Sequence, residues 1–132
     1  MKYVVTGGCG FIGSNYVRGL LSDRWGNNVE QVTVIDSLTY AGNLANLDPV
    51  KSDPRLTFVR EDIVNQKEIT RILEGQDIVV HFAAESHVDR SISGSAEFIR
   101  TNVLGTHSML QASLNTNIKQ FLHVSTDEVY GS

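Results

Sequence analysis

Residues 3–13 read Tyr-Val-Val-Thr-Gly-Gly-Cys-Gly-Phe-Ile-Gly, a short apolar run followed by a glycine-rich loop. The apolar run indicates a buried strand, and apolar residues at helical spacing follow the loop. The glycines at 7, 8, 10 and 13 fit both GxGxxG and GxxGxxG. Between a strand and a helix, Gly7, Gly10 and Gly13 would let backbone N–H groups approach a pyrophosphate. The stretch therefore predicts a dinucleotide-binding loop; the alternative is a tight turn that holds no ligand.

Apolar runs and helical patterns alternate along the rest of the chain. Strands are expected at residues 3–5, 32–35, 56–59, 77–82 and 121–124, and helices at 11–25, 44–47, 63–75 and 97–113. The last helix should turn Phe98, Val103, Met109 and Leu110 inward. Continuous apolar strands separated by helices are typical of a parallel sheet covered on both faces. The sequence predicts an α/β fold, a doubly wound Rossmann sheet of order 3-2-1-4-5 with its ligand at the carboxyl ends of the strands.

Composition and charge indicate a soluble globular protein. The 132 residues suit one domain, and 41% apolar with 20% charged residues is ordinary for a soluble globular chain. Fifteen acidic and eleven basic side chains give a net charge of −4, which argues against nucleic acid or an anionic membrane as the main partner. The single cysteine excludes an internal disulfide, and the first residues do not read as a secretory signal. We expect a soluble, cytoplasmic protein.

Two carboxylates follow predicted strands at positions that suit an adenosine. Asp36 ends the second strand, 23 residues after Gly13, where a carboxylate accepts hydrogen bonds from ribose hydroxyls. Because no Arg or Lys follows it directly, NAD is favoured over NADP. Asp62 and Ile63 follow the third strand, where they could bind the amine and the ring of an adenine. Each carboxylate, taken alone, could equally cap a turn or a helix.

The cysteine and the histidines have structural interpretations. Cys9, inside the glycine loop, is expected to be a small filler rather than a nucleophile. The four histidines have no spacing that suits a shared metal, so no metal site is expected. His81 and His123 fall in predicted strands and are expected in or near the core.

An adjacent pair of carboxylates, Asp127 and Glu128, follows the fifth predicted strand. Such a pair can divide the duties of acid and base if their surroundings separate their proton affinities. Thr126 beside them could hydrogen-bond a substrate hydroxyl. The alternative is a solvated acidic turn without chemistry.

Four stretches, at residues 6–14, 36–43, 83–91 and 125–131, resemble the dTDP-glucose 4,6-dehydratases, a family of extended short-chain dehydrogenase/reductases. The glycine loop is shared across that superfamily, whereas the Thr-Asp-Glu triplet at 126–128 is much narrower. Related 4-epimerases and sugar-nucleotide decarboxylases usually lack the Asp-Glu pair. The resemblance covers all 132 residues but only about the first two-fifths of such an enzyme.

The resemblance implies an NAD-dependent lyase that acts on dTDP-glucose. The sugar is oxidised at C4, water is eliminated across C5 and C6, and the hydride returns to C6, which gives a 4-keto-6-deoxy sugar. Asp127 would be the acid and Glu128 the base. Thr126 would hydrogen-bond to the sugar, and Ser86 would also contact the substrate. The implied cofactor contacts are Gly7, Gly10, Phe11, Ile12, Gly13, Asp36, Ser37, Leu38, Thr39, Asp62, Ile63, Phe82, Ala83, Ala84, Glu85, Ser86 and Thr101.

The sequence departs from the family at the residues that oxidise C4, a Tyr-x-x-x-Lys pair. None of the tyrosines at 3, 16 and 40 has Lys four residues later, and the position four residues after Tyr130 lies past Ser132. We therefore expect residues 1–132 to be an incomplete NAD-binding domain, inactive by itself, whose parent forms homodimers. The helix at 97–113 contributes to the dimer interface in that superfamily, so an exposed apolar patch is expected on it. The alternatives are a non-catalytic dinucleotide-binding fragment and another nucleotide-sugar epimerase, dehydratase or decarboxylase.

Overall fold

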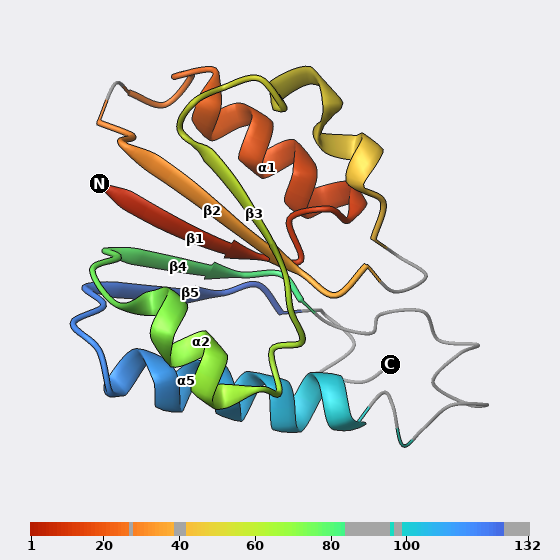
Figure 1. Cartoon of the computed structure of the whole chain (residues 1–132), viewed down its shortest axis with the longest axis vertical. Helices are drawn as coiled ribbons and strands as arrows, with labels where there is room; N and C mark the ends of the chain where they lie inside the picture. Colours follow the sequence, from red (N-terminus) through yellow and green to blue (C-terminus); the bar gives the residue numbers. More distant parts are fainter. Residues whose placement is uncertain (27, 39–41, 84–95, 97–98, 126–132) are drawn as a thin grey trace.

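The computed structural model describes residues 1–26, 28–38, 42–83, 96 and 99–125. Five parallel strands form its central sheet (Figure 1). They are β1 (Lys2–Thr6), β2 (Gln31–Asp36), β3 (Leu56–Arg60), β4 (Ile78–His81) and β5 (Gln120–His123). The strand order is β3-β2-β1-β4-β5, which confirms the doubly wound sheet. The winding direction reverses between β1 and β4, the position at which such sheets bind ligands.

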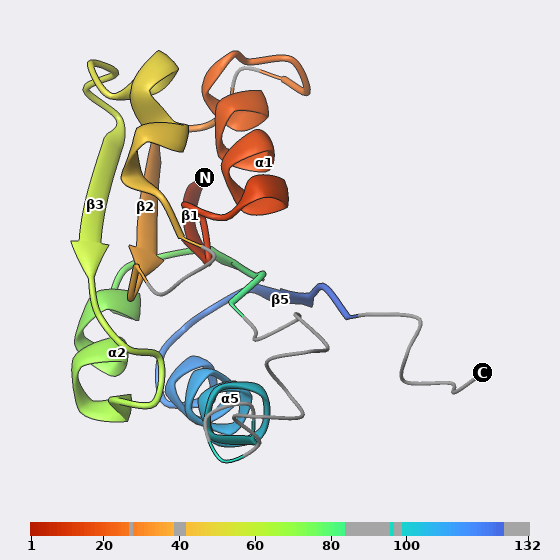
Figure 2. The same cartoon turned by 90° about the vertical axis from the view of Figure 1, so that its right-hand side faces the viewer.

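Helices cover both faces of the sheet (Figure 2). On one face lie α1 (Phe11–Leu21) and the 3₁₀ helix η1 (Leu44–Val50), and on the other lie α2 (Gln66–Leu73) and α5 (Thr106–Leu114). A π-helical segment, η2 (Arg100–Gly105), leads into α5. No helix within the described residues is long and apolar enough to cross a membrane.

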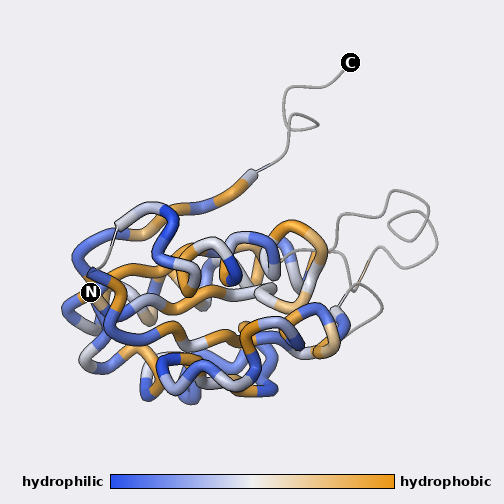
Figure 3. The backbone as a smooth tube through the Cα atoms, turned by 90° about the horizontal axis from the view of Figure 1, so that it is seen from above, coloured by the Kyte–Doolittle hydropathy of each residue, from blue (hydrophilic) through white to orange (hydrophobic). Residues whose placement is uncertain are grey.

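Alternate strand residues supply two separate cores. Val5 and Val34 pack with Val17 of α1 on one face of the sheet. Val4 and Ile35 pack on the other face with apolar side chains of α2 and α5. The strands are apolar on both sides because both sides are covered. The hydropathy-coloured trace accordingly shows apolar stretches in the strands and in the helices above them (Figure 3).

The first helix is shorter than the sequence predicts. α1 ends at Leu21 rather than near Trp25, because Asp23 adopts a left-handed conformation with a φ of 57°. The chain then turns back, and the Trp25 ring lies so close to Gly19 that an added Cβ would be 2.3 Å from it. Trp25 also stacks on Tyr16, with 5.5 Å between the ring centroids. The apolar Trp25 therefore belongs to a turn that packs on the helix.

The second helix starts later than the sequence predicts. α2 begins at Gln66 rather than at Ile63, and Asn65 is its N-cap residue. The Asp62 carboxylate instead accepts a hydrogen bond from the Val64 N–H at 3.0 Å and closes a turn before the helix. Asp62 thus caps a turn and not α2, while Ile63 is buried in the core.

The predicted helix at 97–113 differs from an ordinary α-helix in its first part, where η2 is π-helical. Met109 is buried as expected, but Val103 and Leu110 are 59% and 43% exposed, so their inward placement was wrong. Successive residues in an α-helix point about 100° apart, so burial of Met109 turns Leu110 outward. Phe98 lies outside the described residues. With Leu104 and Leu114 also exposed, the expected apolar patch on this helix is confirmed.

Candidate cofactor site

The carboxyl ends of four strands meet at one edge of the sheet. In the strand register, Thr6 of β1 pairs with Ile35 of β2 and with His81 of β4, and Asp36 pairs with Arg60 of β3. The segments that follow these strands therefore start side by side, where open α/β sheets bind their ligands.

The glycine loop leaves no room for a side chain at two of its positions. Gly7 has a φ of +69°, and a Cβ there would lie 2.8 Å from the Ala83 nitrogen. A Cβ at Gly13 would lie 2.2 Å from the Gly7 carbonyl oxygen. Both distances are shorter than real side chains allow, so the loop needs glycine to pass between α1 and the end of β4. A loop of bare main chain is also what close approach to a pyrophosphate requires.

The N-terminus of α1 follows this loop directly. Gly10 is the N-cap residue, and no side chain of the described residues hydrogen-bonds to the first N–H groups of this 11-residue helix. Its positive end therefore favours a bound phosphate. Phe11 and Ile12 in the first turn are 88% and 65% exposed, although both are apolar. Exposed apolar side chains beside an anion-binding helix end suit contact with a bound molecule.

Asp36 is fixed at the end of β2 by two backbone hydrogen bonds. Its Oδ2 accepts from the Cys9 N–H at 2.9 Å, and its Oδ1 accepts from the Leu38 N–H at 2.8 Å. The residue is 8% exposed, and a Cβ at Gly42 would lie 2.7 Å from Oδ1. A carboxylate has about four lone-pair sites, so two remain that these two N–H groups do not occupy. Asp36 therefore caps a turn, as the alternative held, and keeps the capacity that ribose binding needs.

Cys9 has the properties of a structural residue. It is fully buried, and this burial together with the nearby negative charge of Asp36 raises the pKa of its thiol to about 12. The thiol is protonated at neutral pH and is not a nucleophile, as the sequence predicts. The Cys9 carbonyl accepts hydrogen bonds from the Asn43 N–H at 3.1 Å and from Asn46 Nδ2 at 2.8 Å. The start of η1 therefore braces the loop.

The segment after β3 is joined to η2, the segment that holds Thr101. Arg100 Nη1 donates to Asp62 Oδ2 at 2.6 Å. Gly105 lies against Ile63, since an added Cβ would be 2.5 Å from Ile63 Cδ1. The predicted adenine-binding pair and the predicted contact at Thr101 are thus on neighbouring elements, although they are far apart in the sequence.

At the end of β4, Ala83 is held by β1. Its N–H donates to Thr6 Oγ1 at 3.2 Å, and the Phe82 N–H donates to the Thr6 carbonyl at 3.0 Å. The Phe82 ring lies 5.5 Å from Tyr16 of α1. Phe82 and Ala83 are therefore placed beside the glycine loop, as the resemblance implies.

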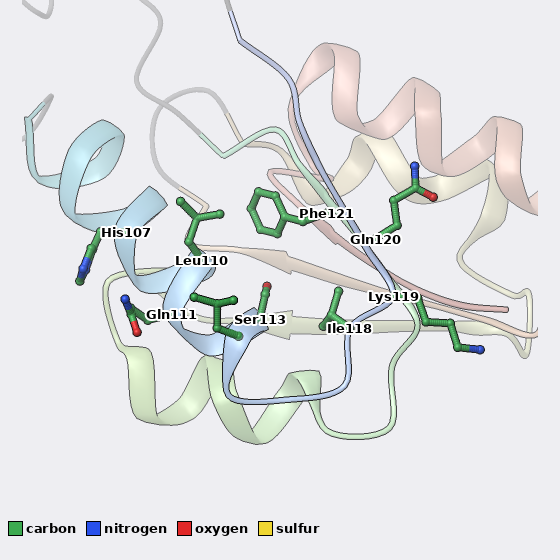
Figure 4. A pocket seen from close by; sticks show the side chains of 9 residues that line it. His107, Leu110, Gln111, Ser113, Ile118, Lys119, Gln120 and Phe121 are labelled. Carbon is green, nitrogen blue, oxygen red and sulfur yellow. The ribbon is translucent and has the colours of Figure 1, made fainter.

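A mainly apolar cavity of about 400 Å³ lies between α5 and β5 (Figure 4). Leu110, Leu114, Ile118 and Phe121 are among the residues that line it. None of the predicted site residues that the structure describes takes part in this lining. This cavity is therefore separate from the described residues of the candidate cofactor site.

Several predicted site residues lie outside the described part of the chain and stay predictions. They are Thr39, Ala84, Glu85, Ser86, Thr126, Asp127 and Glu128. Ser37 and Leu38 follow β2 directly. Over the residues that the structure does describe, no group of three or more His, Cys, Asp or Glu side chains could hold a metal ion.

Sequence reasoning missed three contributors to the site. Thr6 holds the Ala83 N–H, Asn46 braces the glycine loop, and Arg100 pairs with Asp62. The only available signal was a polar residue, Thr6, at the end of an otherwise apolar strand. No spacing in the sequence indicates the other two, because each acts across a long separation along the chain.

Comparison with known proteins places these features in context. The profile of the family described as GDP-mannose 4,6 dehydratase matches residues 4–132. The dTDP-glucose 4,6-dehydratase of Streptomyces niveus is 50% identical over 133 residues, which cover 100% of this chain and 40% of that protein. The dTDP-glucose 4,6-dehydratase of Salmonella typhimurium is 46% identical over 142 residues, or 99% of this chain and 38% of the relative. The chain thus spans about 40% of the length of these relatives.

Solved structures show the same relationship. DesIV, a dTDP-glucose 4,6-dehydratase from Streptomyces venezuelae crystallised with NAD and TYD bound, superposes with a TM-score of 0.97 at 55% identity, over 100% of this chain and 41% of DesIV. A UDP-glucose 4-epimerase from Thermotoga maritima, with UDP-glucose, gives a TM-score of 0.81 at 30% identity, over 96% of this chain and 38% of the epimerase.

Proposed function

Because the chain belongs to the GDP-mannose 4,6 dehydratase family, we propose that it is the NAD-binding part of a dTDP-glucose 4,6-dehydratase. The observation that supports this most is the link between Asp36 and the glycine loop, through the hydrogen bond from the Cys9 N–H at 2.9 Å. It joins the predicted ribose carboxylate and the predicted pyrophosphate loop into one rigid unit. Its similarity to dTDP-glucose 4,6-dehydratases supports the narrower assignment of the substrate.

The described residues fit such a cofactor in three places. Gly7 and Gly13 keep side chains out of the loop that would face the pyrophosphate. Asp36 retains lone pairs for the adenosine ribose, and its negative charge would repel the 2′-phosphate of NADP. Asp62 and Ile63 would contact the adenine, and Phe82, Ala83 and Thr101 would line the remaining part of the site. NAD, when bound, supplies a hydride acceptor beside the sugar.

Two adjacent carboxyl groups, Asp127 and Glu128, would carry out the proton transfers. Glu128 would remove the proton from C5 of the sugar, and Asp127 would protonate the departing C6 hydroxyl. Thr126 and Ser86 would hydrogen-bond to the substrate. Elimination needs one ionised and one protonated carboxyl group, which an adjacent pair can provide when the surroundings differ.

Titration calorimetry of the 132-residue chain with NAD⁺ and NADP⁺ tests the cofactor assignment. The chain should bind NAD⁺ more tightly than NADP⁺, and the substitution Asp36→Ala should reduce that preference. Asp53→Ala is a matched control, since Asp53 is a hydrogen-bonded carboxylate that precedes β3, at the end of that strand away from the candidate site. Equal or tighter binding of NADP⁺ by the unchanged chain would refute the assignment.

A chimera tests the substrate and the catalytic residues. Residues 1–132 would replace the equivalent segment of DesIV, to which this chain is 55% identical. The chimera should convert dTDP-glucose to the 4-keto-6-deoxy sugar, and Glu128→Gln should stop elimination while the reduced cofactor accumulates in a single turnover. An inactive chimera that still binds NAD⁺ would favour the alternative, a non-catalytic dinucleotide-binding protein. Epimerised sugar as the product would instead favour a 4-epimerase.

The exposed apolar side chains of η2 and α5 support a further proposal, that the protein self-associates as a homodimer in the cytoplasm. Val103, Leu104, Leu110 and Leu114 are each more than two-fifths exposed, an unusual concentration on one helical stretch. Sedimentation at rising concentration should show self-association, which Leu114→Glu should weaken. A monomer at every concentration would contradict the homodimer.

A further inference from the structure

A buried chain of polar side chains links β1, β4 and α5 behind the candidate cofactor site. His81 Nδ1 lies 2.6 Å from Thr6 Oγ1, and His81 Nε2 lies 3.2 Å from Thr106 Oγ1. Thr6 is fully buried and His81 is 1% exposed. Buried polar groups of this kind cost free energy unless each has a partner, so their arrangement is specific.

The hydrogen bonds of this chain fit either neutral tautomer of His81. The Ala83 N–H donates to Thr6 Oγ1 at 3.2 Å. The Thr6 hydroxyl keeps its proton and a second lone pair, so it can donate to His81 Nδ1 or accept from it. In the first case His81 Nε2 donates to Thr106 Oγ1, and in the second case it accepts. In both cases one ring nitrogen is the donor and the other is the acceptor, and both threonines are hydrogen-bonded.

The surroundings of His81 agree with a neutral ring. Burial, and to a smaller extent the charge of His123, lowers the pKa of His81 to about 4. His123 on β5 stacks on it with 5.2 Å between the ring centroids, while the groups that face it from β1 and α5 are the uncharged threonines. At neutral pH the ring thus has one acceptor nitrogen and one donor nitrogen.

Both ends of this chain meet segments predicted to contact the cofactor. Thr6 holds the Ala83 N–H, and Ala83 in turn lies against Gly7 of the glycine loop. Thr106 is the first residue of α5, directly after η2, which contains Thr101. The strand order places β4 and β5 in the second mononucleotide half of the fold, opposite the half that contains Asp36.

We propose that His81 is a positioning residue, which fixes Ala83 through Thr6 and the start of α5 through Thr106, so that the nicotinamide half of NAD meets a rigid wall. This inference rests on the proposed function. In this proposal neither threonine nor the imidazole contacts the ligand. They fix the main chain of Ala83 and the start of α5, and the neighbouring segments contact the ligand.

Binding measurements on the 132-residue chain separate positioning from simple stabilisation. Thr6→Val and Thr106→Val keep the side-chain shape and remove one hydroxyl each. Each should weaken NAD⁺ binding by roughly tenfold, the factor that about 1.4 kcal/mol represents. In Thr6→Val, whose partner Ala83 lies at the end of β4, binding of ADP, which lacks the nicotinamide half, should change by less than about twofold. Thr6→Ser and Thr106→Ser should restore NAD⁺ binding. Thr33→Val is the matched control, since Thr33 on β2 is also buried and should leave both ligands unaffected.

Nuclear magnetic resonance gives a readout that does not depend on the cofactor. The ring nitrogen shifts of His81 should show the neutral form, with one of the two nitrogens unprotonated, at pH 7. Amide exchange at Ala83 should accelerate by roughly tenfold or more in Thr6→Val, and much less in Thr33→Val. A protonated ring, or unchanged exchange at Ala83, would overturn the proposal.

The outcomes distinguish this proposal from the proposed function. If the unchanged chain binds NAD⁺ and both valine variants bind it equally well, the positioning role is wrong and the proposed function stands. If the variants lose NAD⁺ and ADP to the same extent, the polar chain only stabilises the fold, and positioning is again wrong. If the unchanged chain binds neither ligand, the proposed function is wrong and the positioning role falls with it.

Discussion

At the end of β2 a carboxylate holds the main chain in place, whereas at the end of β4 an uncharged imidazole does so. Asp36 accepts hydrogen bonds from the Cys9 and Leu38 N–H groups and is proposed to contact the ligand itself. His81 lies between Thr6 and Thr106 and does not itself face the candidate site. It is linked to the main chain of Ala83 through the hydroxyl of Thr6. The two halves of one site are therefore built by different means.

The difference has a consequence for pH. A neutral imidazole keeps its role only while one nitrogen lacks a proton, because protonation turns its acceptor nitrogen into a donor. The β4 half should therefore weaken as the pH falls through the lowered pKa of His81.

The largest effect is expected in the glycine loop, beside which both halves lie. Gly13→Ala would place a Cβ 2.2 Å from the Gly7 carbonyl oxygen, a backbone atom that cannot move aside. We expect the free energy of unfolding to fall by about 3 kcal/mol or more, and binding of both NAD⁺ and ADP to be lost. Urea unfolding and calorimetry would measure the two effects.

Gly75→Ala is the control for this substitution. Gly75 has a φ of +78°, so alanine there is strained by about 1–2 kcal/mol, but nothing lies within 4 Å of the added Cβ. It should lower stability modestly and leave ligand binding unchanged. If Gly13→Ala folded and bound NAD⁺ as well as Gly75→Ala does, the close approach of the loop would be refuted.

Acid should affect the β4 half through His81. The pKa of His81 is lowered from its ordinary value of 6.5 to about 4, first by burial and then by the charge of His123. Between these two pH values the unfolded chain binds a proton that the folded chain does not. The free energy of unfolding should therefore be constant above pH 6.5 and decrease as the pH falls, by about 3 kcal/mol at pH 4.

Denaturant unfolding at pH 7.5 and at pH 4.5 measures this loss. His81→Gln cannot take up the proton, so most of this acid-induced loss of stability should be absent from the variant. At pH 7.5 the variant should be less stable than the unchanged chain. His107→Gln is the control, because His107 is exposed on α5 and its removal should leave the pH dependence unchanged. An unaltered slope in His81→Gln would show that other groups cause the acid loss.

The fold could be predicted from the sequence because it depends on patterns that repeat. Apolar strands, the glycine loop and strand alternation predicted the order β3-β2-β1-β4-β5. Errors arose where one residue overrode a pattern. Asp23 ended α1 with a left-handed turn, and Asp62 closed a turn that delayed α2. The π-helical winding of η2 left no mark in the apolar spacing.

Some residues of the candidate site could likewise be predicted from the sequence, and others could not. Asp36 could be predicted as a ribose-binding residue because a carboxylate at a fixed interval after a glycine loop is a local signal. His81 could only be assigned to the core, which is confirmed, while His123 proved to be exposed on the edge strand and its core placement was wrong. The partners of His81 come from three elements, and the packing that unites them is a property of the fold.

A smaller effect is expected at the packing of η2 on the segment after β3. Gly105→Ala would bring a Cβ to 2.5 Å from Ile63 Cδ1, the far end of a flexible side chain that can move. We expect a loss of stability of about 1–2 kcal/mol, because the core at Ile63 must readjust. Thermal unfolding would measure it, with Ala112→Gly in the same helix layer as a comparison that opens space instead. Undiminished stability in Gly105→Ala would mean that η2 does not pack tightly there.

The smallest effect is expected at the ion pair that joins the two halves, Asp62 with Arg100. Both side chains are about two-fifths exposed, so the pair should contribute only about 0.5 kcal/mol. Asp62→Asn removes the charge but keeps an oxygen for the Val64 N–H, whereas Asp62→Ala removes both interactions. We expect Asp62→Asn to lower the free energy of unfolding by about 0.5 kcal/mol and Asp62→Ala by about 1–1.5 kcal/mol.

Salt separates the two interactions of Asp62. In 0.5 M salt the loss in Asp62→Asn should vanish and the loss in Asp62→Ala should shrink by the same amount, because salt screens an exposed ion pair and not a turn hydrogen bond. Equal losses in the two variants, or a loss that salt does not change, would show that the charge of Asp62 does not join the halves.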